Sequence, residues 1–416
     1  MTSRDPKTVA ETVWRLEAPK LIAAGLRLVR DVAAAEDLAQ DALVAALEQW
    51  PVDGVPANPA AWLTAVVKRR AIDRIRRADR YRQREPELAR RATEHATMND
   101  NTDVDRIDDD LLRLVFIACH PAISQQARVA MSLRLLGGLT TTEIAHAFLV
   151  PDATIGQRIV RAKKDLARVG AALEEPDPTE RSERLDAVLE VIYLIFNEGY
   201  AATSGADWTR PALCDEALRL GRLLRGLMPN ETEVLGLLAL MEFQSSRLAS
   251  RQASDGSAIV LDDQNRSRWD RDRIRRGIAA VAAAEAVEEP MGPYLLQAQI
   301  AACHAKAPTA AETNWSRITF WYDLLAQVVP SPIVQLNRAV SVGRSHGPTA
   351  GLATLDNIRD DPKVVSNHLF CAVRGDLLDQ LGRTQEASAE FERAASLTTN
   401  QTEQHLLRTR AKRSGN

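Results

Sequence analysis

The segment LTTTEIAHAFLVPDATIGQRIVRAKKDL, from Leu139 to Leu166, decides the fold class that we assign to the chain. Thr140 followed three residues later by Glu143 is a capping-box pattern, which predicts a helix that begins at Thr141. Pro151 interrupts the apolar periodicity and suits the first turn of a second helix. Two short apolar-periodic runs around one break therefore predict a helix-turn-helix.

The second of these helices has two distinct faces. Its apolar residues recur at helical spacing and predict one buried stripe, made of Ile155, Ile159, Ala162 and Leu166. The other side carries polar and basic residues, namely Thr154, Gln157, Arg158, Arg161 and Lys164. Such groups on a second helix can enter a major groove, where they contact base edges and phosphates. The alternative is that this basic face is exposed to solvent on a helical bundle that does not bind DNA.

The bulk composition limits the remaining choices. The chain has 416 residues, which is enough for two to four domains. Its net charge is −3, so any nucleic-acid contact must come from local basic patches. Few aromatic and β-branched runs favour helix, and we expect an all-α fold. Without a signal peptide or an apolar run of membrane-spanning length, we expect a cytoplasmic protein that has no membrane partner.

A long amphipathic helix is predicted upstream, in DVAAAEDLAQDALVAALEQW from Asp31 to Trp50. One stripe is apolar and includes Ala39, Leu43, Ala46, Leu47 and Trp50. A second stripe is acidic and partly apolar, with Asp37, Gln40, Asp41, Val44 and Glu48. This second stripe is either a docking face for a partner or a plain solvated face, and its residues alone do not decide between the two.

The segment NPAAWLTAVVKRRAIDRIRRADR follows, from Asn58 to Arg80. Asn58 is a good N-cap and Pro59 suits the first helical position, so a new helix begins here. Its first turns are apolar, and its later part is strongly basic, with Lys68, Arg69, Arg70, Arg74, Arg76, Arg77, Arg80, Arg82 and Arg84 against only Asp73 and Asp79. So many cations cannot all be paired locally, which predicts a polyanion as partner.

The remaining chain divides at two charged segments. Residues 79–110 are basic and then acidic, with few apolar anchors, and predict a flexible connector between helical units at 9–78 and 111–172. The Pro-rich segment EEPDPTER, at 174–181, predicts a break before a long helical region at 183–411. Near its end, small residues and one aromatic recur at the spacing of the tetratricopeptide pattern, at Gly375, Gly382, Ala387, Phe391 and Ala394. Residues 333–358 could be a degenerate copy.

Three of these motifs, in this order and spacing, resemble the extracytoplasmic-function sigma factors of the sigma-70 family. They are AEDLAQDALVAALEQW, AWLTAVVKRRAIDRIRR and the segment from Leu139 to Leu166, and the likeness covers about residues 9–170. CHPAIS, LIFNEGYAA, LLALMEF, LDDQNRSRWD and PSPIVQLNRAV resemble the subgroup with a fused tetratricopeptide-like C-terminal domain. That likeness extends the match to nearly the whole chain.

The resemblance implies a partner for each of these regions. Core RNA polymerase would bind through its β′ clamp at Asp37, Gln40 and Asp41, and its β flap is a second expected contact. Promoter DNA would be held at the minus-10 element by Trp62, Arg69, Arg70, Arg74, Arg76 and Arg77. We favour packing over base stacking for Trp62, because its neighbours are apolar. The minus-35 element would be read by Thr154, Gln157, Arg158, Arg161 and Lys164. The C-terminal domain would control this activity, and a regulatory protein or ligand there is a further candidate partner.

Two departures from the family pattern concern DNA contacts. A basic residue replaces the usual Asn near Lys68 and Arg69, and Gly156-Gln157 replaces a usual Lys-Ser pair. Gly156 costs about 1 kcal/mol of helix propensity and removes one potential contact. Promoter preference therefore cannot be transferred from relatives.

The sequence does not predict an enzyme, a cofactor or a metal site. It lacks a Gly-rich phosphate loop, an HExxH motif and a nucleophile signature. The four cysteines are scattered and lack zinc spacing. LDDQNRSRWD, at 261–270, and FNEGY, at 196–200, are interpreted as structural, a hydrogen-bonded loop and a helix end, with a ligand or peptide site as the alternative for the first. The competing function is a helix-turn-helix regulator that binds DNA without polymerase and carries a tetratricopeptide-like sensor.

Overall fold

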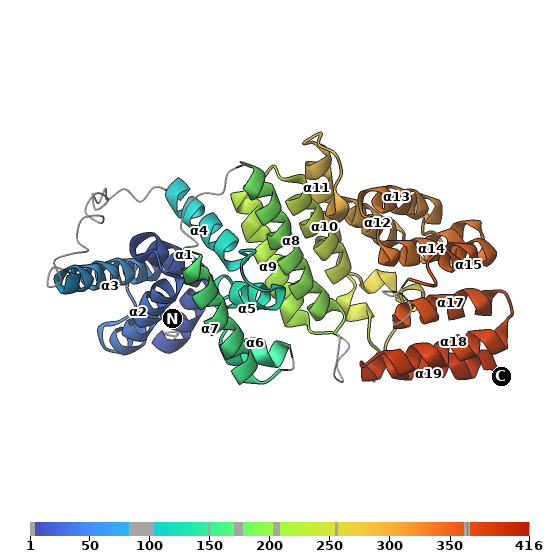
Figure 1. Ribbon diagram of the computed structural model, residues 1–416, viewed down its shortest axis with the longest axis horizontal. Helices are drawn as coiled ribbons and strands as arrows, with labels where there is room; N and C mark the ends of the chain where they lie inside the picture. The colour runs from blue at the N-terminus through green and yellow to red at the C-terminus, as the bar shows by residue number, and fades with distance from the viewer. Residues whose placement is uncertain are drawn as a thin grey trace. The chain divides into compact units, whose positions relative to one another are not determined.

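The computed structural model describes residues 5–82, 104–148, 150–169, 178–202, 209–253, 257–361, 364 and 367–415, and the predicted all-α fold is confirmed there (Figure 1). The only β pairing among these residues is an isolated bridge between Gln252 and Ala258. The chain forms two compact units, residues 1–191 (unit 1) and 192–416 (unit 2), which we describe separately.

Unit 1 begins with three helices that pack on one another, α1 (Pro6–Val29), α2 (Val32–Asp53) and α3 (Pro59–Arg82). Asp31 caps α2 by accepting a hydrogen bond from the Ala34 amide at 2.6 Å, and Asn58 caps α3 through the Ala61 amide at 3.1 Å. The cap and Pro59 confirm the predicted start of α3. Small residues of α2, among them Ala35, Ala39, Ala42 and Ala46, are fully buried, which allows the three helices to approach closely.

The predicted connector at 79–110 has helix at both of its described ends. Helix α3 continues to Arg82, and α4 (Val104–Ala118) begins six residues before the predicted end. Arginine is a good helix former, and acidic residues at a helix N-terminus interact favourably with the helix dipole, so high charge does not prevent helix here. The central part of the connector, 83–103, lies outside the described residues.

Four helices complete the globular part of unit 1, namely α4, α5 (Gln125–Leu135), α6 (Thr141–Ala147) and α7 (Asp152–Arg168). Gly138 has a φ of +67° in the turn before α6, a conformation that glycine adopts without strain. Helix α7 packs on both α5 and α6. Helix α8 (Pro178–Tyr200) contains the boundary between the units and begins inside the predicted break at 174–181, because proline suits a first helical turn.

Unit 2 continues as successive packed helices. They are α9 (Pro211–Leu227), α10 (Thr232–Ser245), α11 (Arg271–Glu285), α12 (Pro293–Lys306), α13 (Trp315–Val328), α14 (Pro332–His346) and α15 (Pro348–Asp356). Helix α10 is buried almost all round and packs on α9, α11 and α12. Glycines mark the closest crossings: a Cβ on Gly236 of α10 would lie 2.5 Å from the Leu295 amide of α12. Within FNEGY, Gly199 similarly meets the Cys214 backbone, so this motif has a structural role.

The loop LDDQNRSRWD is an internal support, as expected. It contains two short 3₁₀ turns, η2 (Leu261–Asp263) and η3 (Arg266–Arg268), and a third, η1 (Leu248–Ser250), precedes it. The buried Arg266 guanidinium donates to the His304 and Ala307 carbonyls at 3.0 and 3.2 Å and to Thr313 Oγ1 at 2.9 Å. Arg266 thereby ties this loop to the end of α12 and the turn that follows.

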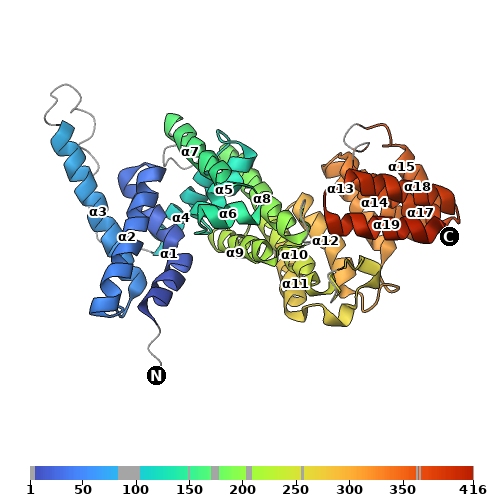
Figure 2. The same cartoon turned by 90° about the horizontal axis from the view of Figure 1, so that it is seen from below.

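The last three helices are α17 (His368–Gln380), α18 (Thr384–Leu397) and α19 (Gln401–Gly415), and they lie side by side (Figures 1 and 2). The predicted small-residue pattern is confirmed: a Cβ on Gly375 would meet the buried Phe391 ring at 2.9 Å. Gly382, with a φ of +72°, makes the turn between α17 and α18. In α14 and α15, the Cα of Gly343 lies 3.0 Å from a Cβ built on Gly351, so residues 333–358 form a second close pair.

None of the described helices combines the length and the hydropathy that crossing a bilayer requires.

Candidate promoter and polymerase interface

Helix α2 presents the predicted acidic stripe to solvent. Asp37, Asp41 and Glu48 are exposed, and Val44 is 49% exposed between them. Gln40 is half-buried, and its side-chain amide donates to Glu36 Oε1 at 2.8 Å. The stripe therefore combines carboxylates with an apolar centre, which is the composition of a surface that could bind a basic partner rather than that of an all-polar solvated face.

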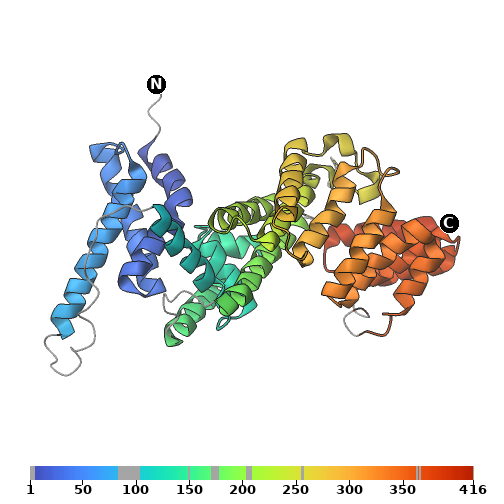
Figure 3. The same cartoon turned by 90° about the horizontal axis from the view of Figure 1, so that it is seen from above.

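The cations of α3 face solvent beyond its apolar first turns. Figures 2 and 3 show α3 extending past the ends of α1 and α2, and its C-terminal half carries the exposed Arg74, Arg76 and Arg77. Among the described residues, neither these three arginines nor Arg69 has a carboxylate partner. A row of unpaired cations on one helix produces the local positive potential that a phosphate backbone requires.

Trp62 lies at the start of α3 and is half-buried. Its ring packs edge-on against the buried Trp50 of α2, with ring centroids 5.6 Å apart and an interplanar angle of 65°. Edge-to-face pairs of this kind contribute about 0.5–1.5 kcal/mol beyond the buried area. The ring thus has a packing role, as its apolar neighbours indicate.

The acidic stripe and the basic helix meet at one ion pair. Arg70 Nη1 of α3 lies 2.9 Å from Asp41 Oδ2 of α2, and the two side chains are 35% and 58% exposed. An exposed pair of this kind contributes about 0–1 kcal/mol to stability, so either partner can exchange it for an external ligand at small cost. Sequence spacing did not predict this pair, because its members are 29 positions apart on different helices.

The helix-turn-helix is formed as predicted. Thr140 Oγ1 accepts from the Glu143 amide at 3.1 Å, and Glu143 accepts from the Thr140 amide at 2.8 Å, so the capping box begins α6 at Thr141. Pro151 is the N-cap of α7 and directly precedes its first turn. Thr142 Oγ1 donates to Asp152 at 2.6 Å and links the two helices across the turn.

Helix α7 has the two faces that its sequence predicts. Ile155, Ile159, Ala162 and Leu166 are all buried. On the opposite side Gln157, Arg161 and Lys164 are exposed, and Thr154 and Arg158 are half-buried. No carboxylate partners Arg158, Arg161 or Lys164 in the described part of the chain.

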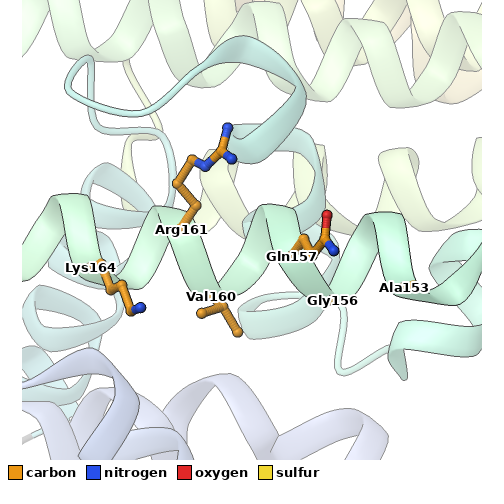
Figure 4. Close-up of a pocket in the computed structure, with 6 residues that line it drawn as sticks. All are labelled: Ala153, Gly156, Gln157, Val160, Arg161 and Lys164. Atoms are coloured by element: carbon orange, nitrogen blue, oxygen red, sulfur yellow. The ribbon is translucent and has the colours of Figure 1, made fainter.

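The outer face of α7 is also hollowed. A shallow, open depression is lined by Ala153, Gly156, Gln157, Val160, Arg161 and Lys164 (Figure 4). Arg161 and Gln157 point to one side of the helix, and Val160 and Lys164 point to the other. Val160 is 53% exposed, and open space surrounds the position of a Cβ on Gly156. This face could receive both polar base edges and a thymine methyl group.

The sequence did not predict one buried cluster of charged residues. Glu36 of α2, whose side chain is 4% exposed, accepts from Arg134 Nε of α5 at 2.6 Å, and Lys163 Nζ of α7 lies 2.6 Å from its other oxygen. Burial alone would raise the pKa of Glu36, but Lys163 and Arg134 outweigh it and hold the pKa below its ordinary value. Glu36 stands beside Asp37 in sequence, but its partners are about 100 and 130 residues away, so no local pattern reveals them.

The described residues contain no group of three or more His, Cys, Asp or Glu side chains that could hold a metal ion. The four cysteines are free thiols, and burial raises the pKa of Cys119 and Cys371 to about 11. In unit 2, burial and then Arg247 and Arg266 lower the pKa of His304 to about 3, which keeps its ring neutral.

Comparison with known families matches three parts of the chain. Residues 13–81 match sigma-70 region 2, residues 113–166 match sigma-70 region 4, and residues 184–285 match the family of unknown function DUF6596. The first match runs from within α1 to the end of α3, and the second runs from within α4 to near the end of α7. The third covers the start of the helical extension.

Three individual proteins are similar to this chain in sequence or in structure. "Uncharacterized protein R00370" of Rhizobium meliloti (strain 1021) is 41% identical over 392 residues, which are 94% of this chain and 92% of that protein. "Probable ECF RNA polymerase sigma factor SigI" of Mycobacterium tuberculosis (strain CDC 1551 / Oshkosh) is 28% identical over 177 residues, 42% of this chain and 59% of that protein. Among solved structures, yeast Tom70 aligns over 98% of this chain and 84% of its own, with a TM-score of 0.38 and 12% identity.

The two region matches lie in the order, and on the helices, that the sequence analysis assigned to a sigma factor. The chain belongs to the sigma-70 family, as an extracytoplasmic-function sigma factor with a helical C-terminal extension.

Proposed function

We propose that this sigma factor binds core RNA polymerase through α2, with Asp37, Gln40 and Asp41 docking on the β′ clamp. The exposed carboxylates around Val44 support this assignment, because they offer a basic partner both charge and apolar contact. Within the same chain, residues 111–172 would contact the β flap. As functional parts we propose 9–78 and 111–172 for promoter recognition, joined by 79–110, and 183–411 for control.

Helix α3 is proposed to hold the minus-10 element. Arg69, Arg74, Arg76 and Arg77 would contact phosphates, and Arg70 would join them when Asp41 turns to polymerase. Trp62 would support the fold of this surface through Trp50 rather than stack on a base. Cations at this density make binding strongly dependent on salt.

Helix α7 is proposed to read the minus-35 element. Gln157 and Arg161 would donate to base edges, while Thr154, Arg158 and Lys164 would contact the backbone or neighbouring bases. The observation that carries the whole proposal is the combination within unit 1 of one acidic exposed helix and two unpaired basic faces. An ordinary helix-turn-helix regulator needs only the last of these.

Run-off transcription tests the proposal directly. The template is the upstream region of the protein's own gene, transcribed by core polymerase with and without the full chain. An Asp37→Lys/Asp41→Lys variant is expected to abolish the transcript. As matched control, Glu288→Lys/Glu289→Lys reverses two exposed charges in the loop before α12 and should leave the transcript unchanged.

The result also separates the two candidate functions. A transcript that requires core polymerase and intact α2 supports a sigma factor. Tight binding to the same duplex at physiological salt, with no transcript, would instead favour a regulator that acts without polymerase.

The C-terminal unit is proposed to control this activity. Support comes from the relative of 41% identity, which aligns over both the sigma regions and nearly all of the extension, so the two parts occur together in one chain. We expect truncation at about residue 175 to lower transcription while α1–α7 remain folded, as circular dichroism would show. Full activity of the truncated chain would contradict a requirement for the extension.

A further inference from the structure

Three arginines of unit 2 gather where the residues that follow α10 meet the turn η3. They are Arg247, Arg251 and Arg266, which we call the arginine cluster. The Ser246 carbonyl accepts from the Asp270 amide at 2.8 Å, and η1 packs on η3, so the first two arginines lie beside the loop that carries the third. Arg247 is half-buried, and the other two side chains are buried.

The partners of Arg247 and Arg266 are neutral. Arg266 donates to two carbonyls and one hydroxyl, and its guanidinium carbon lies 5.1 Å from the centroid of the Trp269 ring. The guanidinium carbons of Arg251 and Arg247 lie 3.8 and 5.4 Å from the centroid of the Tyr200 ring. Among the described residues, no carboxylate forms an ion pair with Arg247 or Arg266. Aromatic rings and carbonyls attract a cation, but they do not cancel its charge.

Two carboxylates act on Arg266, and neither pairs with it. Burial lowers the pKa of Arg266, Asp262 opposes this change, and Arg247 adds to it. Asp262 itself forms an ion pair with Arg344, and Glu312, which also opposes the change, is exposed to water that screens its charge. Positive charge therefore remains uncompensated between Arg247 and Arg266.

Groups beside the cluster respond to this excess of positive charge. Burial, and then Arg247 and Arg266, lower the pKa of His304 to about 3. In the described part of the chain, His304 Nδ1 and Arg266 Nε are buried and have no hydrogen-bond partner. Uncompensated charge and unsatisfied polar atoms cost stability when they are buried, and they gather where a ligand supplies the missing partner.

We propose that the arginine cluster binds a small organic anion, whose carboxylate or phosphate group lies at Arg247. The planar guanidinium of Arg247 donates two parallel hydrogen bonds to two oxygens of that group. Burial raises the pKa of Tyr322, and Arg247 only partly opposes this, so the Tyr322 hydroxyl stays protonated and is a further donor. The half-buried rings of Tyr200 and Tyr322 offer apolar contact to the rest of the molecule. This inference concerns unit 2 alone and does not rest on the proposed function.

Thermal unfolding of the full chain tests the site with simple anions. Sodium phosphate presents the phosphate group and sodium acetate the carboxylate, each compared with sodium chloride at the same ionic strength. At ten times its dissociation constant, a bound anion raises the folding constant about tenfold. For a unit of this size, we expect the melting temperature to rise by about 3–5 °C in phosphate or in acetate above its value in chloride. The salt that gives the rise identifies the group that binds.

The test variant is Arg247→Met, which removes the charge and keeps most of the side-chain length. We expect the rise in phosphate or acetate to be lost, while the melting temperature in chloride equals or exceeds that of wild type, because one like charge leaves the cluster. A purely structural Arg247 would give a lower melting temperature in all three salts and would retain the rise. Arg247→Lys keeps the charge but not the two parallel hydrogen bonds, so it should bind the same anion about tenfold more weakly.

Arg408→Met is the matched control, because Arg408 of α19 is an exposed arginine for which the described residues supply no carboxylate partner. It should respond to each salt as wild type does. Equal melting temperatures of wild type in all three salts would overturn the proposal, and so would an undiminished rise in Arg247→Met. If that variant does not fold, an undiminished rise in Arg247→Lys has the same meaning. Loss of the rise in Arg408→Met would also overturn it, because anions would then bind arginine side chains in general.

Discussion

The pair between Asp41 and Arg70 allows the proposed polymerase contact to be separated from fold stability. Asp41→Asn keeps the shape of the side chain and removes its charge. The pair joins side chains that are 58% and 35% exposed, so its loss should cost at most about 1 kcal/mol of unfolding free energy. If Asp41→Asn acted only by destabilising the fold, this loss could weaken polymerase binding by no more than about fivefold.

If Asp41 instead contacts polymerase directly, its substitution should weaken polymerase binding more than this. Removing one partner of a desolvated charge pair at an interface costs about 2–5 kcal/mol, which is a loss of affinity of roughly 30-fold or more. We therefore expect Asp41→Asn to weaken core polymerase binding at least tenfold with little change in thermal unfolding. Arg70→Gln, which frees the carboxylate from its internal partner, should bind core polymerase as tightly as wild type or up to about fivefold more tightly.

Fluorescence anisotropy of the labelled full chain against core polymerase at physiological salt measures both variants. Glu17→Gln, with the same loss of one carboxylate from an exposed pair, should match wild type. If Asp41→Asn binds core polymerase within twofold of wild type, this carboxylate is not a docking group and the assignment of the α2 stripe is wrong at that position.

Four further predictions concern stability. Gly375→Ala should destabilise the chain by about 1–3 kcal/mol in urea unfolding, because its Cβ meets Phe391, whereas Gly156→Ala has open space and should stabilise by about 0.5–1 kcal/mol. His304 has a folded-state pKa of about 3, so between about pH 6.5 and 3 it is neutral in the folded chain and protonated in the unfolded chain. The free energy of unfolding should therefore fall by about 1.4 kcal/mol for each unit by which the pH is lowered in this range, and His304→Gln should remove this dependence. Arg266→Met should cost about 3 kcal/mol in the same urea assay, since it leaves three buried acceptors without their donor.

Sequence patterns predicted those structural features that depend on residues close together in the chain. The capping box at Thr140, the cap at Asn58 and the buried stripe of α7 each depend on residues within four positions of one another, and all three are confirmed. The small-residue crossing at Gly375 was predicted from a longer repeat pattern, because the spacing from Gly375 to Phe391 defines a two-helix unit.

Long-range electrostatics could not be predicted in this way. The high charge of 79–110 suggested a connector, but charge alone does not prevent helix, and both described ends of this segment are helical. Similarly, no periodicity relates Glu36 to Lys163, or Asp41 to Arg70, because these pairs depend on how separate helices pack. Among the proposed site residues, the sequence identified the exposed ones from their helical faces but not the internal partners that some of them have.

The central claim is that this chain directs promoter-specific initiation by core polymerase. The most direct measurement is sequencing of RNA 5′ ends after transcription in vitro of genomic DNA from the encoding organism, with core polymerase alone and with core polymerase plus the full chain. The account predicts new start sites that share upstream elements, need the wild-type chain and disappear with Asp37→Lys/Asp41→Lys. The same start sites with and without the chain, together with tight duplex binding by the chain alone, would contradict it.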